Sequence, residues 1–410
     1  MARALALTAG VLAAALAGCN PFGTSGAFTC ENDTQCNVQG ATGGGRCEMT
    51  TGFCSYADDT CPDGHRYGDN AGGNSGKCVG GGAGDDGGID SPPGPPCYGA
   101  TNGIVKVCFA TPPTGDVPLP GTIDTDASTL CTTPMSGGNG YCVIAGNAIH
   151  ADDSVVVTGL KPLILVAVTS ITIVAGATLD LASHISPARV GAGAGSPDCG
   201  AGTLPIAGSG GGGGAGGSFG GKGGNGGNGG GGGTSGKPAA VQTPTILRGG
   251  CPGQDGINGT PGVGGKGGGA VYLIADSTIT ISGAINASGE GGHAGQTGSA
   301  GGGGGGSGGM IGLDAPTIDN TGVVFANGAS GGEGSGTSTP GNPGPEPTST
   351  AASAPPMSAS TSGGDGGGGS GGGTATGGNA ANGTNGGGGG GGGIGVIKVY
   401  RGTLNGMRSP

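Results

Sequence analysis

The chain has 410 residues, of which 113 are glycine, 3% are aromatic and none is tryptophan, and its formal net charge is −11. Only 33% of the residues are hydrophobic, too few for an ordinary globular core of this size. The acidic balance argues against nucleic acid as a partner. Because glycine loses more backbone entropy on ordering than any other residue, the glycine runs must satisfy their backbone groups densely or stay disordered.

The N-terminus carries an apolar run typical of an export signal and too short for a permanent transmembrane helix. The run ends in LAGC at Cys19, which resembles a bacterial lipobox. The resemblance implies removal of residues 1–18 as a signal peptide and a diacylglyceryl group on Cys19 that anchors the chain to a membrane. Asn20 follows, and the lack of Asp there favours an outer-membrane, surface-exposed address. The alternative is an ordinary secretory signal with Cys19 as a stray thiol.

The cysteine count agrees with export. The chain has 13 cysteines, and 12 remain when Cys19 is set aside. This even number predicts disulfides in an oxidising compartment. The disulfide candidates are Cys30, Cys36, Cys47, Cys54, Cys61, Cys78, Cys97, Cys108, Cys131, Cys142, Cys199 and Cys251.

Residues 19–78 are predicted to form a small Cys-rich disulfide module, because polar, turn-rich sequence separates its six paired cysteines. A segment with so few apolar residues needs covalent cross-links to fold. The connectivity is open, since six cysteines allow about 15 pairings. Zinc is the rival interpretation, but the paired C-x2-C clusters that it needs are missing, and we expect no metal.

The same segment carries a family resemblance. The run from Phe28 to Val79, with RCEMTTGFCSYADDTCPDGHRYGD and a closing GKCV, resembles a Cys-rich module of uncharacterised myxobacterial-type surface lipoproteins. In several of these a glycine-rich β domain follows, as it does here. The resemblance implies architecture and location, and no activity comes with it.

The rest of the chain divides by composition. A Gly/Pro/Asp linker covers 79–96, and a Cys-containing cap is predicted for 97–153. Strand repeats with glycine-rich excursions are expected over 154–402, followed by a tail at 403–410. The Pro/Ser/Thr/Ala insertion at 337–362 is predicted to be disordered.

Three copies of a strand pattern define the repeat. The segment 163–183 aligns with 270–289, so that Leu165 and Ile171 match Leu273 and Ile279. A third copy spans 310–328, and a fourth first strand ends at 400. Short alternating strands rich in Val, Ile and Thr, repeated in one direction, predict an all-β right-handed parallel β-helix of three to four coils. The alternative is a β-sandwich with disordered glycine-rich loops.

Glycine recurs at every third position in the excursions, which all leave the repeat at the same corner. It does so from 208 to 232, from 253 to 268 and from 289 to 304. Three residues per turn is the repeat of the polyproline II helix, and glycine at that spacing lets extended chains approach closely. A bundle of polyproline II helices is therefore expected, with disordered loops as the alternative. Cys199 and Cys251 flank the first excursion and would tie its base if bridged.

No catalytic constellation assembles in the sequence. None of the histidines belongs to a recognisable motif: His65, His150, His184 and His293 are each isolated in the sequence. Asp152 and Asp153, beside His150, are interpreted as part of a solvated turn. Asp180, Asp276 and Asp314 are isolated, although Asp276 and Asp314 fall near each other in the repeat alignment.

We therefore expect no catalysis and no cofactor. The predicted role is structural or adhesive, with binding to extracellular glycan or another cell surface. The alternative is a polysaccharide-active β-helix enzyme.

The lipobox assignment makes a direct prediction. Replacing the proposed acyl acceptor in Cys19→Ser should release the protein from the membrane fraction and abolish incorporation of labelled palmitate. Fractionation and metabolic labelling measure both effects. A variant that stayed membrane-bound and labelled would contradict the assignment.

Overall fold

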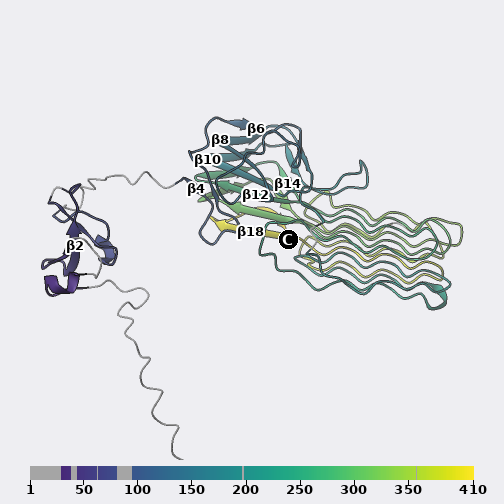
Figure 1. The fold of residues 1–410 in the computed structure, drawn as a ribbon. Helices are drawn as coiled ribbons and strands as arrows, with labels where there is room; N and C mark the ends of the chain where they lie inside the picture. Colours follow the sequence, from purple (N-terminus) through teal and green to yellow (C-terminus); the bar gives the residue numbers. More distant parts are fainter. Residues whose placement is uncertain (1–28, 38–43, 62, 81–94, 196–197, 357) are drawn as a thin grey trace, which may run out of the picture. The chain divides into compact units, whose positions relative to one another are not determined.

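The computed structural model describes residues 29–37, 44–61, 63–80, 95–195, 198–356 and 358–410 (Figure 1). These belong to two compact units, one within 1–94 and the other at 95–410. The predicted signal peptide, Cys19 and most of the predicted linker lie outside the described residues. No helix among the described residues is long and apolar enough to cross a membrane.

The first unit is a small antiparallel sheet held by disulfides. Its strands are β1 (Arg46–Glu48), β2 (Phe53–Ala57) and β3 (His65–Tyr67), with short 3-10 turns η1 (Asp33–Cys36) and η2 (Gly72–Asn74). Three disulfides link this unit. Much of its buried apolar material is cysteine itself, as expected where a core is too small to hold the fold without cross-links.

The second unit is a parallel β-helix whose strands form two sheets. The first and middle strands of each coil share an eight-stranded sheet: β6 (Val117–Pro118), β8 (Cys142–Ala151), β10 (Leu163–Ile173), β12 (Ala270–Ala275), β13 (Thr278–Ile281), β15 (Met310–Asp314), β16 (Thr317–Asn320) and β18 (Val396–Arg401). The third strands form a six-stranded sheet: β7 (Thr122–Asp124), β9 (Val155–Thr158), β11 (Thr178–Asp180), β14 (Ala284–Asn286), β17 (Val323–Phe325) and β19 (Met407–Ser409).

The strand register confirms the repeat alignment. Leu165 pairs with Leu273, which in turn pairs with Leu313. In the other sheet Leu179 pairs with Ile285. Every pairing within these two sheets is parallel, so the antiparallel sandwich is excluded and the β-helix is confirmed.

The repeat begins earlier than the sequence predicts. Residues 142–158, assigned largely to a cap, form a full coil in which Ile144 and Ile149 pair with Leu165 and Ile171. The sequence pattern hid this coil because Gly146 and Asn147 interrupt the alternation and a bulge displaces the register.

The cap region divides into two parts. Its strands β6 and β7 pair with β8 and β9 and place Leu119 and Ile123 in the core at the start of the helix, where the cap is expected. The hairpin of β4 (Cys97–Tyr98) and β5 (Val107–Cys108) packs on the outer face of the first-strand sheet and not over the end of the helix. Tyr98 and Val107 join a second buried cluster there with Ile164 and the fully buried Tyr272. The first strands are therefore apolar on both faces, like other strands that are covered on both sides.

The glycine-rich excursions form an ordered bundle. They leave after β11, β14 and β17 and return to β12, β15 and β18, so all three project from the same corner (Figure 1). Hydrogen bonds between segments advance three residues at a time: the amides of Gly211, Gly214 and Gly217 donate to Ser299, Gly302 and Gly305 at 2.8–2.9 Å. This is the repeat of packed polyproline II helices, and the disordered-loop alternative is wrong.

Close approach explains why glycine is required in the bundle. A Cβ on Gly214 would lie 2.0 Å from the carbonyl oxygen of Gln254, and one on Gly303 would lie 2.1 Å from that of Val263. Backbone packed at this distance leaves no room for any side chain. The glycines of these segments therefore bury no side chains of their own, and the segments are held together by backbone hydrogen bonds.

The described residues of the insertion, 337–356 and 358–362, are ordered, contrary to the sequence prediction. The carboxylate of Glu333 is fully buried and accepts hydrogen bonds from the amides of Asn342, Ala359 and Ser360 at 3.0, 2.8 and 2.7 Å. Hydrogen bonds to a charged acceptor are about twice as strong as neutral ones. The composition of the insertion predicted disorder because Glu333, which binds its amides, lies outside the insertion and is not part of that composition.

The close approach of the glycines predicts position-dependent stability. A Cβ on Gly367 would lie 2.1 Å from the oxygen of Gly378, whereas one on Gly368 would lie 3.3 Å from its nearest neighbours, on Ser353 and Pro355. We expect Gly367→Ala to lower the free energy of unfolding by about 1–3 kcal/mol, and its neighbour Gly368→Ala by less than about 1 kcal/mol. Denaturant unfolding with the disulfides intact measures both. Equal losses would contradict the packing described here.

Candidate functional site

The twelve candidate cysteines form six disulfides. The pairs are Cys30–Cys47, Cys36–Cys54, Cys61–Cys78, Cys97–Cys108, Cys131–Cys142 and Cys199–Cys251. The expected disulfides are thus present, and they indicate an oxidising compartment.

The bridge between Cys199 and Cys251 ties the base of the first excursion, as the sequence suggested. Arg248 lies against it, with Nη2 3.0 Å from the Cys199 sulfur and 3.1 Å from the Cys251 sulfur. Its guanidinium also stacks over the Phe219 ring, 5.0 Å from the centroid. Burial lowers the pKa of Arg248. The excursion is therefore fixed where it leaves the β-helix by a covalent bond and a buried aromatic contact.

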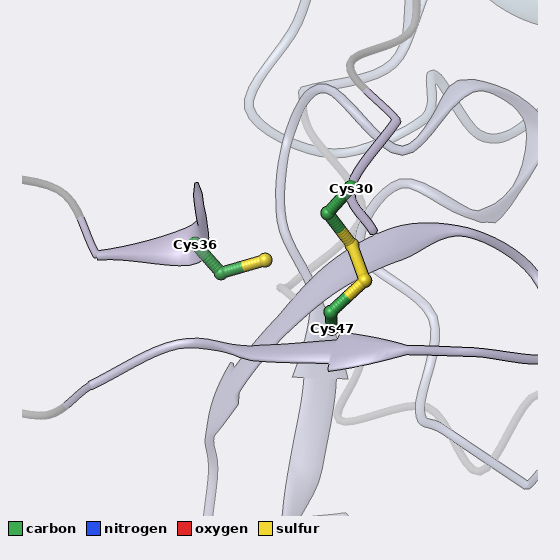
Figure 2. Close-up of side chains that lie close together, drawn as sticks. All are labelled: Cys30, Cys36 and Cys47. Atoms are coloured by element: carbon green, nitrogen blue, oxygen red, sulfur yellow. A yellow bond between two sulfur atoms is a disulfide. The ribbon is translucent and has the colours of Figure 1, made fainter. Parts of the chain in front are cut away.

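One group of potential metal ligands lies within the described residues, and it is formed by cysteines. The sulfur atoms of Cys30, Cys36 and Cys47 lie within 4.8 Å of one another (Figure 2). Two of them are bonded to each other and the third to Cys54. Because a disulfide sulfur is not a thiolate, the oxidised cluster offers no metal ligand.

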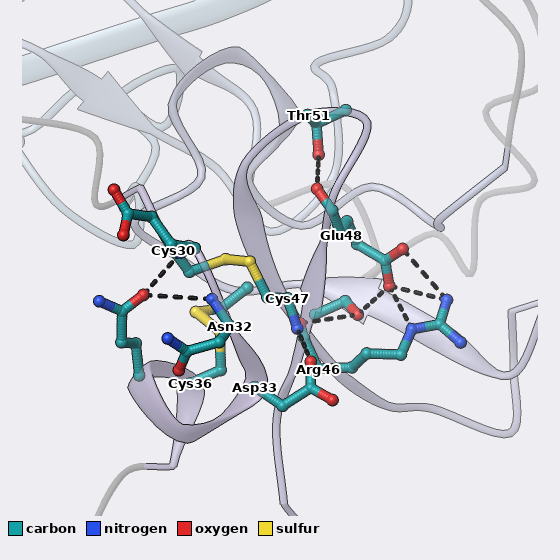
Figure 3. Close-up of a disulfide and its surroundings, with 12 residues drawn as sticks. Cys30, Asn32, Asp33, Cys36, Arg46, Cys47, Glu48 and Thr51 are labelled. Atoms are coloured by element: carbon teal, nitrogen blue, oxygen red, sulfur yellow. Dashed lines mark hydrogen bonds and ion pairs between the residues drawn. A yellow bond between two sulfur atoms is a disulfide. The ribbon is translucent and has the colours of Figure 1, made fainter.

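The polar groups around these bridges serve the local fold. Asp33 accepts a hydrogen bond from the amide of Cys47 at 2.8 Å, and Arg46 forms an ion pair with Glu48 at 2.8 Å (Figure 3). The first interaction links η1 to β1, and the second lies within β1, so both stabilise the part of the module that carries Cys36 and Cys47.

Asp276 and Asp314, the only paired carboxylates that the sequence indicated, both contact Arg401. Nε of Arg401 donates to Asp314, and its Nη2 lies 3.8 Å from Asp276. The side chain of Asp276 is about half exposed at 49%, whereas that of Asp314 is fully buried at 0%. The two aspartates thus meet through a shared arginine, but in different environments.

Both carboxylate oxygens of Asp314 accept hydrogen bonds from other groups of the protein. One oxygen accepts from the hydroxyl of Tyr272 and from the amide of Ala100, both at 2.6 Å, and the other accepts from Arg401. Burial raises the pKa of Tyr272, and burial raises that of Tyr400 beside it to about 12, so neither phenol is a base at neutral pH. Asp314 therefore clamps the hairpin to β12, β15 and β18.

A second polar cluster was missed by sequence reasoning. His184 was expected to stand alone, but its Nδ1 is 2.7 Å from Glu346 and its Nε2 is 3.7 Å from Asp180. Asp180 also binds Arg189 and accepts a hydrogen bond from Asn286 at 3.2 Å. Glu346 reaches the cluster from the insertion, 162 residues away from His184, a separation that no local pattern could reveal.

The remaining histidines do not build a site with the candidate aspartates. His150 lies on β8, where it pairs with Thr172, and the neighbouring Asp152 and Asp153 are exposed. Nε2 of His293 is 3.2 Å from Glu290, whose other oxygen accepts from the amide of Lys266.

Two surface depressions lie among the described residues of the second unit. One, of about 500 Å³, lies at the last coil between Ile397, Val399 and Leu404. The other, of about 380 Å³, is lined by Tyr141, Leu160 and Ile246 among others. Neither is lined by Asp276 or Asp314.

Comparison with known proteins gives no further guidance: no family model, no curated protein sequence and no solved structure matches this chain.

The Asp314 clamp predicts unequal effects of two neutral substitutions. Asp314→Asn should lower the free energy of unfolding by about 1.5–3 kcal/mol, because it weakens buried hydrogen bonds to a charged acceptor. Asp276→Asn should cost less than about 0.5 kcal/mol, as an exposed ion pair does. Chemical denaturation of both variants checks the ranking, and a reversed order would refute the clamp.

The His184 cluster predicts a pH-dependent stability. The carboxylates of Asp180 and Glu346 raise the pKa of His184 to about 9, above its ordinary value of 6.5. The stabilisation is therefore complete below pH 6.5 and is lost as the pH rises through about 9. The Tm should fall across this interval in the wild type and fall less in His184→Gln. Parallel curves for the two proteins would contradict the assignment.

Proposed function

We propose that this chain is an exported, lipid-anchored cell-surface protein with a structural or adhesive role, in which the glycine-rich bundle presents a surface to glycan or to another cell. The observation that carries the proposal is the bundle itself, a rigid projection fixed to one corner of a disulfide-linked β-helix (Figure 1). Such a projection costs a great deal of backbone entropy. A role in display explains why the chain maintains it.

The flat sides of the bundle are built to be inert. At one outer edge the side-chain oxygens of Asn379 and Asn382 accept the amides of Asn225 and Asn228 at 2.8 Å. Elsewhere Asp255 accepts the amide of Gly264 at 2.7 Å. Polar side chains thus replace the missing neighbouring chain at these edges. This protects the edges from pairing with other chains and supports a role as a stable exposed spacer.

Membrane attachment through Cys19 is the second part of the proposal. Support comes from the LAGC sequence, from the six disulfides of an oxidising compartment and from the resemblance to myxobacterial-type surface lipoproteins. In chain order, the Cys-rich module would directly follow a lipid at Cys19, and the bundle would come later.

The enzyme alternative rests on Asp276 and Asp314 alone. Glycoside hydrolysis needs one carboxyl as acid and a second as base or nucleophile. Asp314 is occupied by Tyr272, Ala100 and Arg401, which speaks against either role.

The proposal is tested with the exported chain made soluble by Cys19→Ser. The purified protein should coat cells or extracted extracellular matrix saturably and should release no reducing sugar from polysaccharides. Protease treatment of intact cells expressing the wild type should remove it from the surface. Sugar release that Asp276→Asn or Asp314→Asn abolished would establish the enzyme alternative, and the absence of both binding and surface exposure would refute the proposal.

A further inference from the structure

The far end of the bundle differs in chemistry from its sides. Besides the all-glycine turn η3 (Gly230–Gly232), whose first amide donates to Asn385 at 2.7 Å, five turns gather there, at residues 258–260, 297–299, 337–339, 361–362 and 384–385, each where one extended segment reverses into the next (Figure 1). These five turns carry the polar side chains of this end. We call this set the tip surface. Its residues read NGT, TGS, TST, TS and TN. Apart from two glycines, every residue bears a hydroxyl or an amide, and none is charged.

Hydrogen bonds join these turns into one continuous surface. The amide of Gly298 donates to the carbonyl of Thr337 at 3.0 Å, and the side chain of Asn258 donates to the carbonyl of Gly298 at 3.3 Å. The side chain of Asn385 donates to the hydroxyl of Ser362 at 3.0 Å and to that of Thr337 at 3.4 Å. Segments far apart in sequence are therefore locked together at the tip.

The backbone is strained at this same place. Among the described residues, Asn258 (φ 74°) and Ser299 (φ 57°) are the non-glycine residues with positive φ, and both belong to the tip surface. Asparagine tolerates this conformation, but serine adopts it seldom. Ser299 is buried, so this strain fixes the shape of the turn and does not present the serine side chain.

Turn propensity accounts for only part of the composition. Tight turns favour Gly, Asn, Asp and Pro, which explains Asn258-Gly259, Gly298 and the prolines that follow two of the turns at 261 and 340, but threonine recurs in all five turns. Threonine is β-branched and stiff about χ1, so it offers a hydroxyl and a methyl group in a fixed direction at little entropic cost on binding. Thr260, Thr297, Thr339 and Thr361 are exposed.

We propose that the tip surface is the binding site of this protein and that its ligand is a neutral glycan. Hydroxyl and amide groups donate and accept hydrogen bonds at once, which matches sugar hydroxyls. A polyanion would call for Lys or Arg, and a metal ion would call for carboxylates. The inference rests on the proposed adhesive function and specifies which part of the bundle acts and on what class of ligand.

The test compares two triple variants of the soluble Cys19→Ser chain. The tip variant carries Thr260→Ala, Thr297→Ala and Thr339→Ala. The matched control carries Thr243→Ala, Thr374→Ala and Thr376→Ala, which are equally exposed but lie where the bundle joins the β-helix. Circular dichroism and the Tm check that both fold as the parent does.

Binding is measured on cellulose, chitin and dextran as neutral probes and on alginate and heparin as charged ones. We expect the parent to bind at least one neutral polymer, the tip variant to bind it at least tenfold more weakly, and the control to match the parent. Preference for the charged polymers, or equal weakening in both variants, would overturn the inference.

The outcome separates the inference from the proposed function. If the parent coats cells but the tip variant coats them equally well, the adhesive role stands and the tip assignment fails. If the parent binds cells but none of the neutral polymers, the glycan assignment fails. If the parent binds neither cells nor polymers, both fail.

Discussion

The architecture depends on one interaction, the hydrogen bond between backbone amides and carbonyls of chains too close together for a Cβ. In the bundle an added methyl group would meet a neighbouring carbonyl oxygen at about 2 Å at position after position. Glycine contributes no apolar surface, so the segments cannot be held by a hydrophobic core. Their order comes from the many hydrogen bonds between backbone groups of buried segments, where an unpaired group is costly. One misplaced side chain therefore affects several segments at once.

The β-helix sets the register of the bundle segments relative to one another. The ladder continues from sheet to bundle without a break: the amide of Ala270 donates to Ala192 at 2.7 Å, that of Met310 to Gly269 at 3.1 Å, and that of Val396 to Gly309 at 2.8 Å. Coil stacking thus fixes the starting point of every excursion, and the three-residue repeat carries that register outward. The apolar coil interior provides the hydrophobic free energy, and the disulfide at Cys199–Cys251 secures the longest excursion.

Charged side chains serve this assembly from within. Glu333 gathers three amides of the insertion, Glu346 brings the insertion to His184, and Asp314 joins the outer hairpin to three strands. Each is buried in full or in large part and is matched by donors, which is the condition under which a buried charge is tolerated. These carboxylates are committed to the structure, whereas the tip surface is uncharged and exposes threonine hydroxyls.

The sequence alone determined the features that repeat. Strand alternation at period two placed Leu165, Leu273 and Leu313 in one column, glycine at period three indicated packed polyproline II segments, and an even cysteine count after Cys19 predicted six bridges. Each is a local or periodic signal. Only the tertiary structure decided the early coil at 142–158, the order of the insertion at 337–362, the partners of His184 and the gathering of five turns into the tip surface. Those features depend on contacts between residues far apart in the chain, made possible when coil stacking brings the excursions together, and no local pattern encodes such contacts.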